Sequence, residues 1–350
     1  MNDNHLVIMA GGIGSRFWPL STPTVPKQFI DIMGVGKTLI QLTADRFADF
    51  IPAENVWIVT SKGYKDLVRK QLPEVPESNI LLEPCMRNTA PCIAYVSWKI
   101  KKKHPNANIV VSPADHIVLK ADEFKRVISK GLEFTASSAN ILTLGIQPSR
   151  PETGYGYIKR MSEVVVPEIF KVDSFKEKPD LAKAQTYVEE GVYLWNAGIF
   201  LWNVNTIEAA FRQCEPQMSA IFDKLANDFY TEKEQDSIDT HFPTCKAISI
   251  DYAIMEHAEN IYVFPSDLGW SDVGTWGSLY ELSTKDEDQN VVLSDNCRVI
   301  ECKNCMTHVS DKTKIVVQGL DNCIIAENNG VFLICKKDQE QRIKEFSQLS

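Results

Sequence analysis

Glycines and cations gather directly after the first predicted strand of the sequence. Residues 10–16 read AGGIGSR, and residues 26–28 read PKQ. Glycines let backbone N–H groups close around an anion, and an arginine and a lysine add positive charge. A loop of this composition is typical of a polyphosphate site. The predicted phosphate-binding residues are Gly11, Gly12, Gly14, Arg16 and Lys27.

Two other phosphate-binding motifs do not fit this region. A dinucleotide-binding fingerprint that begins at Gly12 requires a small residue at position 17, where the sequence has Phe17. A Walker loop that ends at Thr38 requires a glycine at position 31, where the sequence has Asp31. An ordinary turn with incidental glycines is the remaining alternative.

Two aspartates far apart in the chain are candidate ligands of a divalent cation. Asp115 follows a predicted strand in IVVSPADH, residues 109–116, and Asp272 lies in GWSDVGTW, residues 269–276. Mg²⁺ prefers carboxylate oxygens, although either aspartate alone can simply cap a helix or a turn. Because an α/β fold gathers the ends of its strands at one rim, we predict that the two carboxylates bind Mg²⁺ together.

The segment LEPCMRNTAP, residues 82–91, also follows a predicted strand. Asn88 or Thr89 suits the cap of the helix that should come next. The segment alone is as consistent with a capped turn as with a binding role.

Three segments in the middle of the chain suit the binding of a sugar phosphate. ETGYGY ends at residue 157, and its Gly156 allows close backbone approach. FKEKP pairs a carboxylate for hydroxyls, Glu177, with a cation for phosphate, Lys178. WNAGI offers the Asn196 amide, which donates and accepts hydrogen bonds. The alternatives are a solvated surface ion pair for Glu177 and Lys178, and core packing for the aromatic residues of these segments.

Short β-branched runs alternate with longer helical patterns over the first half of the chain. The expected strands are 5–10, 56–60, 80–82, 109–112, 141–144, 155–160, 169–175 and 193–202, and the expected helices are 38–51, 64–72, 90–103, 124–135 and 204–212. This alternation predicts an α/β fold with a Rossmann-like, mostly parallel or mixed sheet and helices on both faces. We expect residues 1–285 to form this α/β domain.

The pattern of predicted secondary structure changes after residue 285. Six short strands separated by turn residues follow one another too closely for helices to fit between them. We predict a small all-β, β-helix-like segment over residues 286–350 that ends in a helix over 336–349. Unpaired strand edges need covering, so this segment is the expected contact of a homodimer.

Composition and charge narrow the class of protein. The chain has 350 residues, a net charge of −9 and 44% hydrophobic residues, which is an ordinary globular mixture. The negative charge disfavours nucleic acid and anionic membranes as partners. Nine scattered cysteines and the lack of a leader or membrane span predict a cytoplasmic protein. Cys302, Cys305 and His308 lack the second ligand pair of a zinc site, so buried thiols are the favoured interpretation.

Taken together, these motifs resemble those of the mannose-1-phosphate guanylyltransferases, within the sugar-1-phosphate nucleotidyltransferase superfamily. GGxGxR, PKQ, EPxxRNTAP, PADH, TGYGY, EKP, WNAGIF and WSDVGTW occur here in the family's order, between residue 5 and about residue 280. Phe17 and Thr22 stand where the family pattern has leucine and arginine, so a phosphate or loop contact at Thr22 is in doubt. Longer relatives carry a histidine-rich, metal-binding isomerase barrel, which we expect to be absent here.

The resemblance implies a role for each candidate residue. GTP and mannose 1-phosphate would be the substrates and Mg²⁺ the cofactor. The GTP phosphates would be held by Gly11, Gly12, Gly14, Ser15, Arg16 and Lys27. Guanine would be held by Glu83, Arg87, Asn88, Thr89 and Ala90. Mannose 1-phosphate would be held by Gly156, Glu177, Lys178 and Asn196, with Asp115 and Asp272 on the metal.

The implied reaction is in-line attack of the sugar phosphate on the α-phosphorus of GTP, with release of pyrophosphate. Arg16, Lys27, Asp115, Lys178 and Asp272 would be the catalytic groups. Guanylyl transfer to another sugar 1-phosphate is one alternative. A non-catalytic relative that binds a nucleotide sugar and regulates a partner is the other.

Overall fold

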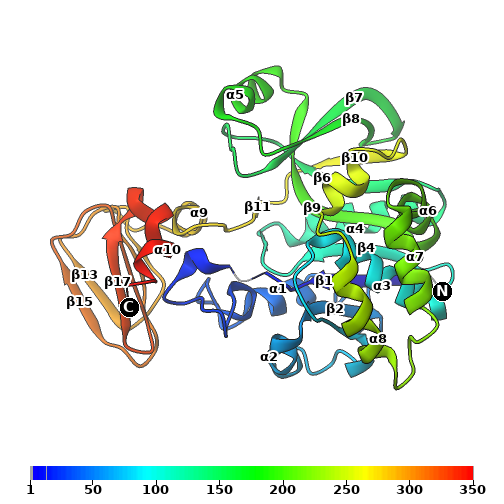
Figure 1. Ribbon diagram of the computed structural model, residues 1–350. Helices are drawn as coiled ribbons and strands as arrows, with labels where there is room; N and C mark the ends of the chain where they lie inside the picture. The colour runs from blue at the N-terminus through cyan, green and yellow to red at the C-terminus, as the bar shows by residue number, and fades with distance from the viewer. Residues whose placement is uncertain (1–2, 13, 350) are drawn as a thin grey trace. The chain divides into compact units, whose positions relative to one another are not determined.

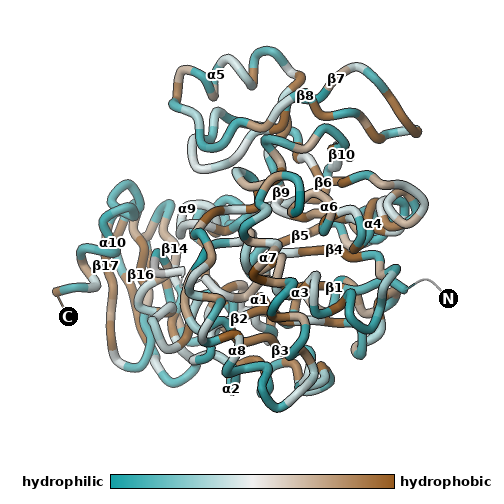
Figure 2. The backbone as a smooth tube through the Cα atoms, turned by 45° about the vertical axis from the view of Figure 1, so that its right-hand side comes forward, coloured by the Kyte–Doolittle hydropathy of each residue, from teal (hydrophilic) through white to brown (hydrophobic). Residues whose placement is uncertain are grey.

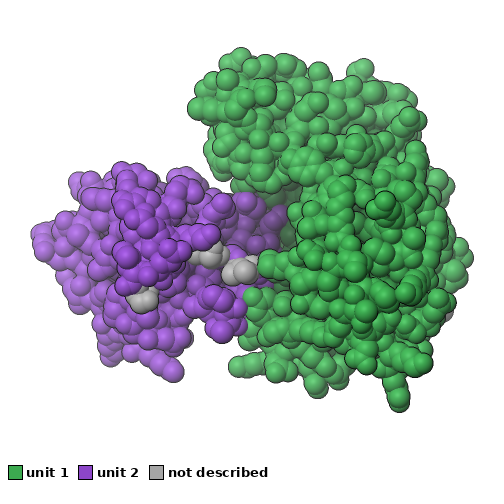
Figure 3. Space-filling model, viewed as in Figure 1, with its two compact units in different colours: residues 1–11, 43–114, 118–270 green, residues 12–42, 115–117, 271–350 purple. Residues whose placement is uncertain are grey.

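The computed structural model describes residues 3–12 and 14–349. The chain divides into two compact units (Figure 3). Unit 1 comprises residues 1–11, 43–114 and 118–270, and unit 2 comprises residues 12–42, 115–117 and 271–350. The boundary at 285/286 stays a prediction.

Unit 1 is built on one mixed sheet of nine strands among the described residues, in the order β3-β2-β1-β4-β9-β6-β10-β8-β7. The strands are β1 (Asn4–Met9), β2 (Val56–Ser61), β3 (Ile80–Glu83), β4 (Asn108–Pro113), β6 (Ile141–Ile146), β7 (Gly156–Val166), β8 (Ile169–Glu177), β9 (Tyr193–Asn203) and β10 (Ile261–Ser266). The first four are parallel, whereas β9 runs antiparallel to both β4 and β6. The central strands are buried apolar runs, as β4 shows in Figure 2.

Helices cover both faces of this sheet (Figure 1). They are α2 (Lys65–Gln71), α3 (Thr89–Lys103), α4 (Ala121–Ala136), α5 (Leu181–Glu190), α6 (Val204–Cys214), α7 (Pro216–Leu225) and α8 (Glu234–His241). Successive residues of β9 point to opposite faces: Phe200 and Trp202 join the core cluster that contains α3, whereas Leu201 faces Gly131 of α4. The predicted α/β fold with helices on both faces is confirmed.

The helix predicted over 38–51 is wrong in its second half. Helix α1 (Leu39–Asp45) is shorter, because several of the following residues bond three positions back rather than four: Phe47 N–H donates to Ala44, and Phe50 N–H to Phe47. Helices α5, α7 and α8 and strand β10 were not predicted from the sequence.

Unit 2 contains the β-helix-like segment. Its strands are β12 (Val291–Val292), β13 (Cys297–Ile300), β14 (Met306–His308), β15 (Ile315–Gln318), β16 (Cys323–Asn328) and β17 (Val331–Lys336). Strands β12, β14 and β16 stack in parallel, and β13 stacks in parallel on β15, so the chain coils through repeated turns. The predicted β-helix-like segment is therefore confirmed.

Short helical elements accompany this coil in unit 2. They are η1 (Ser15–Phe17), η2 (Lys27–Phe29), α9 (Trp276–Leu282), η8 (Lys337–Arg342) and α10 (Ile343–Phe346). The helix predicted over 336–349 is instead a 3₁₀ turn followed by a single α-helical turn. None of the helices described is both long enough and apolar enough to cross a membrane.

Candidate active site

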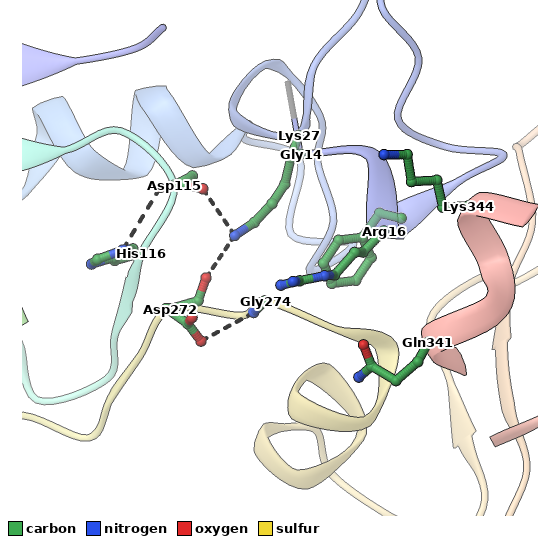
Figure 4. A pocket seen from close by; sticks show the side chains of 10 residues that line it. Gly14, Arg16, Lys27, Asp115, His116, Asp272, Gly274, Gln341 and Lys344 are labelled. Carbon is green, nitrogen blue, oxygen red and sulfur yellow. Dashed lines mark hydrogen bonds and ion pairs between the residues drawn. The ribbon is translucent and has the colours of Figure 1, made fainter. Parts of the chain in front are cut away.

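A pocket of about 540 Å³ lies within unit 2 (Figure 4). It is lined by Gly14, Arg16, Phe17, Lys27, Asp115, His116, Asp272, Gly274, Gln341 and Lys344. The fold therefore brings together five of the predicted catalytic and phosphate-binding residues, which come from three distant stretches of the chain.

Lys27 organises the pocket. Its side chain is buried, and its Nζ donates to Oδ2 of Asp115 at 3.1 Å and to the backbone carbonyl of Asp272 at 2.6 Å. Gly14 has a φ of +59°, and a Cβ added there would lie 2.4 Å from Cβ of Lys27. Only glycine allows the loop to pass this close to the lysine. Gly12 belongs to the same loop, and its carbonyl accepts from Nε2 of Gln28 at 2.8 Å.

Asp115 faces the Lys27 amine with its carboxylate, whereas Asp272 faces it with its backbone carbonyl (Figure 4). Burial raises the pKa of Asp115, but the charges of Lys27 and His116 and the hydrogen bond from Lys27 outweigh it, so this pKa lies below its usual value. Oδ1 of Asp272 accepts from the Gly274 N–H at 3.1 Å. An ionised carboxylate and a second carboxylate in one polar pocket form a donor set that suits Mg²⁺.

Arg16 is an exposed cation on η1 whose guanidinium extends into the pocket (Figure 4). The next residue, Phe17, is fully buried and packs against Trp276 at a ring-centroid distance of 5.2 Å. Phe17 thus anchors the backbone that presents Arg16. The side chain of Ser15 lies outside the described part of the structure. The hydroxyl of Thr22 bonds locally to Thr24 and to the Val25 N–H.

In unit 1, Glu83 ends strand β3 as a buried carboxylate. Its Oε1 accepts no hydrogen bond from any residue that the structure describes, and burial raises its pKa to about 8. A Cβ added at Gly11 would lie 3.2 Å from Oε2 of Glu83, so the missing side chain leaves room beside the carboxylate.

The turn that follows Glu83 is held by hydrogen bonds to a distant part of unit 1. Arg87 donates to the carbonyl of Pro243 at 2.5 Å. Asn88 has a φ of +68° and caps α3 by accepting from the Thr89 N–H. The Thr89 hydroxyl accepts from the Ile250 N–H at 2.8 Å, and Ala90 N–H donates to the carbonyl of Ile248. The predicted cap and a fixed turn are therefore both present.

The predicted sugar-phosphate residues form a second cluster in unit 1. A Cβ at Gly156 would lie 2.5 Å from Oε2 of Glu177 and 3.5 Å from Cβ of Asn196, so this strand approaches both side chains closely. Lys178 is exposed, has a φ of +45° and forms an ion pair with Glu177. That pair matches the surface alternative as well as the binding role.

Asp251 joins this cluster and was missed in the sequence. Asn196 Nδ2 donates to Oδ1 of Asp251 at 2.8 Å, while Oδ1 of Asn196 accepts from the Gly198 N–H at 3.0 Å. Burial, followed by the charge of Glu177, raises the pKa of Asp251 to about 6. Because Asp251 follows no strand, its only sequence signal is an aspartate within the apolar run ISIDYAIM.

Two other groups resemble metal sites but have local explanations. The thiols of Cys302 and Cys305 donate to backbone carbonyls, and Nε2 of His308 faces the carbonyl of Asp31, so the predicted burial of these thiols is confirmed.

Asp3, His5 and His104 lie close enough together to suggest a metal site. His5 Nδ1 accepts from the indole N–H of Trp57 at 3.1 Å, so its proton sits on Nε2 and faces Asp3 at 2.9 Å. This hydrogen-bonded tautomer explains the cluster without a metal.

Comparison with known proteins shows which family the chain resembles. The family model described as nucleotidyl transferase matches residues 5–289. A mannose-1-phosphate guanylyltransferase of Salmonella montevideo is 38% identical, over 93% of this chain and 71% of its own length. The mannose-1-phosphate guanylyltransferase RfbM of Salmonella typhimurium is 35% identical, over 97% of this chain and 70% of its own length.

A solved structure from Thermus thermophilus, described as a mannose-1-phosphate geranyltransferase, has a TM-score of 0.90 and 28% identity. The match covers 99% of each chain, so it includes both units. With the family model matching most of the sequence and five of the predicted catalytic and phosphate-binding residues gathered in one pocket, the chain belongs to the nucleotidyl transferase family.

Proposed function

We propose that the protein is a mannose-1-phosphate guanylyltransferase, which converts GTP and α-D-mannose 1-phosphate to GDP-mannose and pyrophosphate. The observation that carries the proposal is the unit 2 pocket, where Arg16 and Lys27 meet Asp115 and Asp272. The names of relatives that are 35–38% identical over more than nine tenths of this chain support the choice of substrates.

In the proposed reaction, an oxygen of the sugar phosphate attacks the α-phosphorus of GTP and forms a new P–O bond. The bond to the β-phosphate breaks, and pyrophosphate leaves. The nucleophile is already an anion at neutral pH, so no general base is needed. The barrier comes from the approach of two anions and from charge that grows on the phosphoryl oxygens. Arg16, Lys27 and Lys178 would offset that charge.

Asp115 and Asp272 would hold Mg²⁺, and Lys27 orients both residues through its two hydrogen bonds. When bound, the metal would neutralise phosphate charge and help to align the reacting groups. The depressed pKa of Asp115 supports this role, because only the ionised carboxylate binds a cation well.

Glu83 is the proposed reader of the base. Guanine presents two adjacent donors, N1–H and N2–H₂, and an ionised carboxylate offers two acceptors that match them. Glu83 is buried and has an oxygen without a hydrogen bond among the described residues, which supports a role in accepting from a ligand. The turn from Arg87 to Ala90 would complete the base site.

Glu177, Asn196 and Lys178, with close backbone approach at Gly156, are the proposed sugar-phosphate residues. We add Asp251 as a positioning residue, because it accepts from the Asn196 amide and so fixes which atom of that amide faces the sugar. A carboxylate and an oriented amide suit the hydroxyls of a hexose, and a lysine suits its phosphate.

The direct test is pyrophosphate release from GTP with mannose 1-phosphate, together with mass spectrometry of the nucleotide product. We expect GDP-mannose, and weaker turnover with other sugar 1-phosphates and with UTP or dTTP. A higher kcat/KM with a different sugar phosphate would establish the first alternative. Nucleotide-sugar binding without turnover of any pair would establish a regulatory relative.

Cytoplasmic location and a homodimer complete the proposal. Exposed apolar side chains on the β-helix-like segment support a subunit contact there: Ile300, Val316, Phe332 and Ile334 are 48–66% exposed. Light scattering of the full chain should give twice the monomer mass. A monomer at high concentration would remove the dimer from the proposal.

A further inference from the structure

The end of the chain contributes to the pocket that holds the predicted phosphate residues. Gln341, on η8, and Lys344, on α10, line the unit 2 pocket together with Arg16 and Lys27 (Figure 4). The two residues are three positions apart, a spacing that places side chains on one face of a helical turn. No sequence motif pointed to either of them.

Specific contacts hold this end of the chain in place. Ile343, between the two residues, is fully buried in the same apolar cluster as Phe17 and Trp276. Glu340 accepts from the Gly277 N–H at 2.7 Å, at the start of helix α9. A Cβ at Gly277 would approach both Glu340 oxygens to 3.2 Å, so this contact is close. Side chains on either side of Ile343 are thus presented by a fixed backbone.

The cations that line the pocket differ in whether they form ion pairs within the protein. The Lys27 amine is occupied by Asp115 and by the carbonyl of Asp272. Arg16 and Lys344 form no ion pair with any carboxylate among residues 3–12 and 14–349, and both are exposed. Two cations without such an ion pair, and the amide donor of Gln341, therefore line a pocket that Gly14 of the glycine loop also lines. This combination suits an anion with several phosphate oxygens.

We propose that Lys344 and Gln341 bind the two distal phosphates of the nucleotide and the pyrophosphate that leaves. Lys344 contributes a point charge with three donors, and Gln341 contributes its amide N–H₂ group. This inference rests on the proposed function for the identity of the ligand. It gives the C-terminal segment a part in phosphate binding in addition to any part in subunit contact.

The test uses the 350-residue chain and inorganic pyrophosphate, titrated by calorimetry in Mg²⁺ buffer. Lys344→Ala should weaken pyrophosphate binding on the order of ten-fold, the effect of losing one charge-assisted contact, and Gln341→Ala a few-fold. Lys344→Arg should retain most of the affinity. Arg342→Ala is the matched control: Arg342 lies on the same segment, carries the same charge, pairs with Glu345 at 3.0 Å and does not line the pocket.

Unchanged pyrophosphate affinity in Lys344→Ala would overturn the proposal, as would an equal loss in Arg342→Ala, which would indicate a general charge effect. Failure of the wild-type chain to bind pyrophosphate would overturn it as well. Lys344 is exposed, so the fold should survive; should Lys344→Ala unfold, Lys344→Met provides the same comparison. Wild-type protein that binds pyrophosphate but makes no GDP-mannose would contradict the proposed function and leave this inference standing.

Discussion

Asp115 in unit 2 and two buried carboxylates of unit 1, Glu83 and Asp251, are held in opposite ways. Asp115 in the unit 2 pocket accepts from the buried Lys27 amine, and its pKa is lowered. Glu83 and Asp251 in unit 1 lie in buried surroundings without a cation bonded to them among the described residues, and their pKa values rise to about 8 and about 6. Asp115 is therefore stabilised in its ionised form before any ligand binds, whereas the surroundings of Glu83 and Asp251 favour the protonated acid.

This difference indicates two ways of preparing a site for a ligand. A carboxylate that must hold a cation is kept ionised by a neighbouring lysine. A carboxylate that must accept hydrogen bonds from a neutral base or a sugar can stay protonated until the ligand supplies the donors. Five substitutions test this comparison, and they follow from the largest expected effect to the smallest.

Asp115→Asn and Asp272→Asn should each lower turnover on the order of 100-fold or more, because the charge that holds the proposed metal is lost. The fold should be largely retained. Steady-state kinetics at saturating Mg²⁺, with circular dichroism as the control for folding, measures both effects. Near-normal turnover in either variant would remove that residue from the metal site.

Glu83→Gln should weaken GTP binding by about 1–3 kcal/mol, because one acceptor oxygen is replaced by a donor that opposes guanine. The substitution should also lower the ratio of kcat/KM for GTP to kcat/KM for UTP. Since the Glu83 pKa is about 8 in the free protein, this carboxyl is mostly protonated at pH 7. GTP would bind the ionised carboxylate, so binding should release close to one proton.

Calorimetry in buffers with different ionisation enthalpies measures that proton release. The Gln variant should release none. Equal proton release by both proteins, or an unchanged GTP-to-UTP ratio of kcat/KM, would show that Glu83 does not read the base.

Asp251→Asn tests the raised pKa through stability. The folded pKa of about 6 lies above the unfolded value near 3.9, so ionisation of Asp251 destabilises the fold as the pH rises through this window. Relative to wild type, the variant should gain roughly 2–3 kcal/mol in unfolding free energy between pH 4 and pH 8. Urea unfolding at both pH values measures this. A difference that does not change with pH would contradict the shifted pKa.

Lys178→Ala should have the smallest effect on binding energy, because Lys178 is 63% exposed. We expect a several-fold higher KM for mannose 1-phosphate, a lower kcat and nearly unchanged GTP binding. Lys183→Ala is a matched control, since Lys183 is also exposed and paired with an acid, Asp180. Weaker GTP binding in Lys178→Ala would assign Lys178 to the nucleotide instead.

The sequence was sufficient for features that depend on local pattern and sheet topology. The buried strands β1 and β4 are continuous apolar runs, and the meeting of Asp115 with Lys27 follows from loops that succeed strands. The pKa of Glu83 was not predictable, because it depends on burial by residues distant in the chain.

Asp251, Gln341 and Lys344 were missed for a related reason. Each reaches its site through contacts made by other residues: Asp251 through the Asn196 amide, and the C-terminal pair through the burial of Ile343. Such contacts leave no spacing pattern in the sequence. The early end of α1 likewise depends on three-residue turns that helical periodicity does not distinguish from a longer helix.

The contact between Gly277 and Glu340 has a consequence for protein engineering. A tail taken from a relative docks in the same way most readily if the recipient keeps glycine at position 277 and the graft supplies a carboxylate at position 340, since a Cβ at 277 would lie 3.2 Å from both of its oxygens and the carboxylate would have to shift. Positions 277 and 340 lie 63 residues apart in the sequence and should therefore be exchanged as a pair. Chimeras that exchange them together should fold more cleanly than chimeras that exchange either one alone.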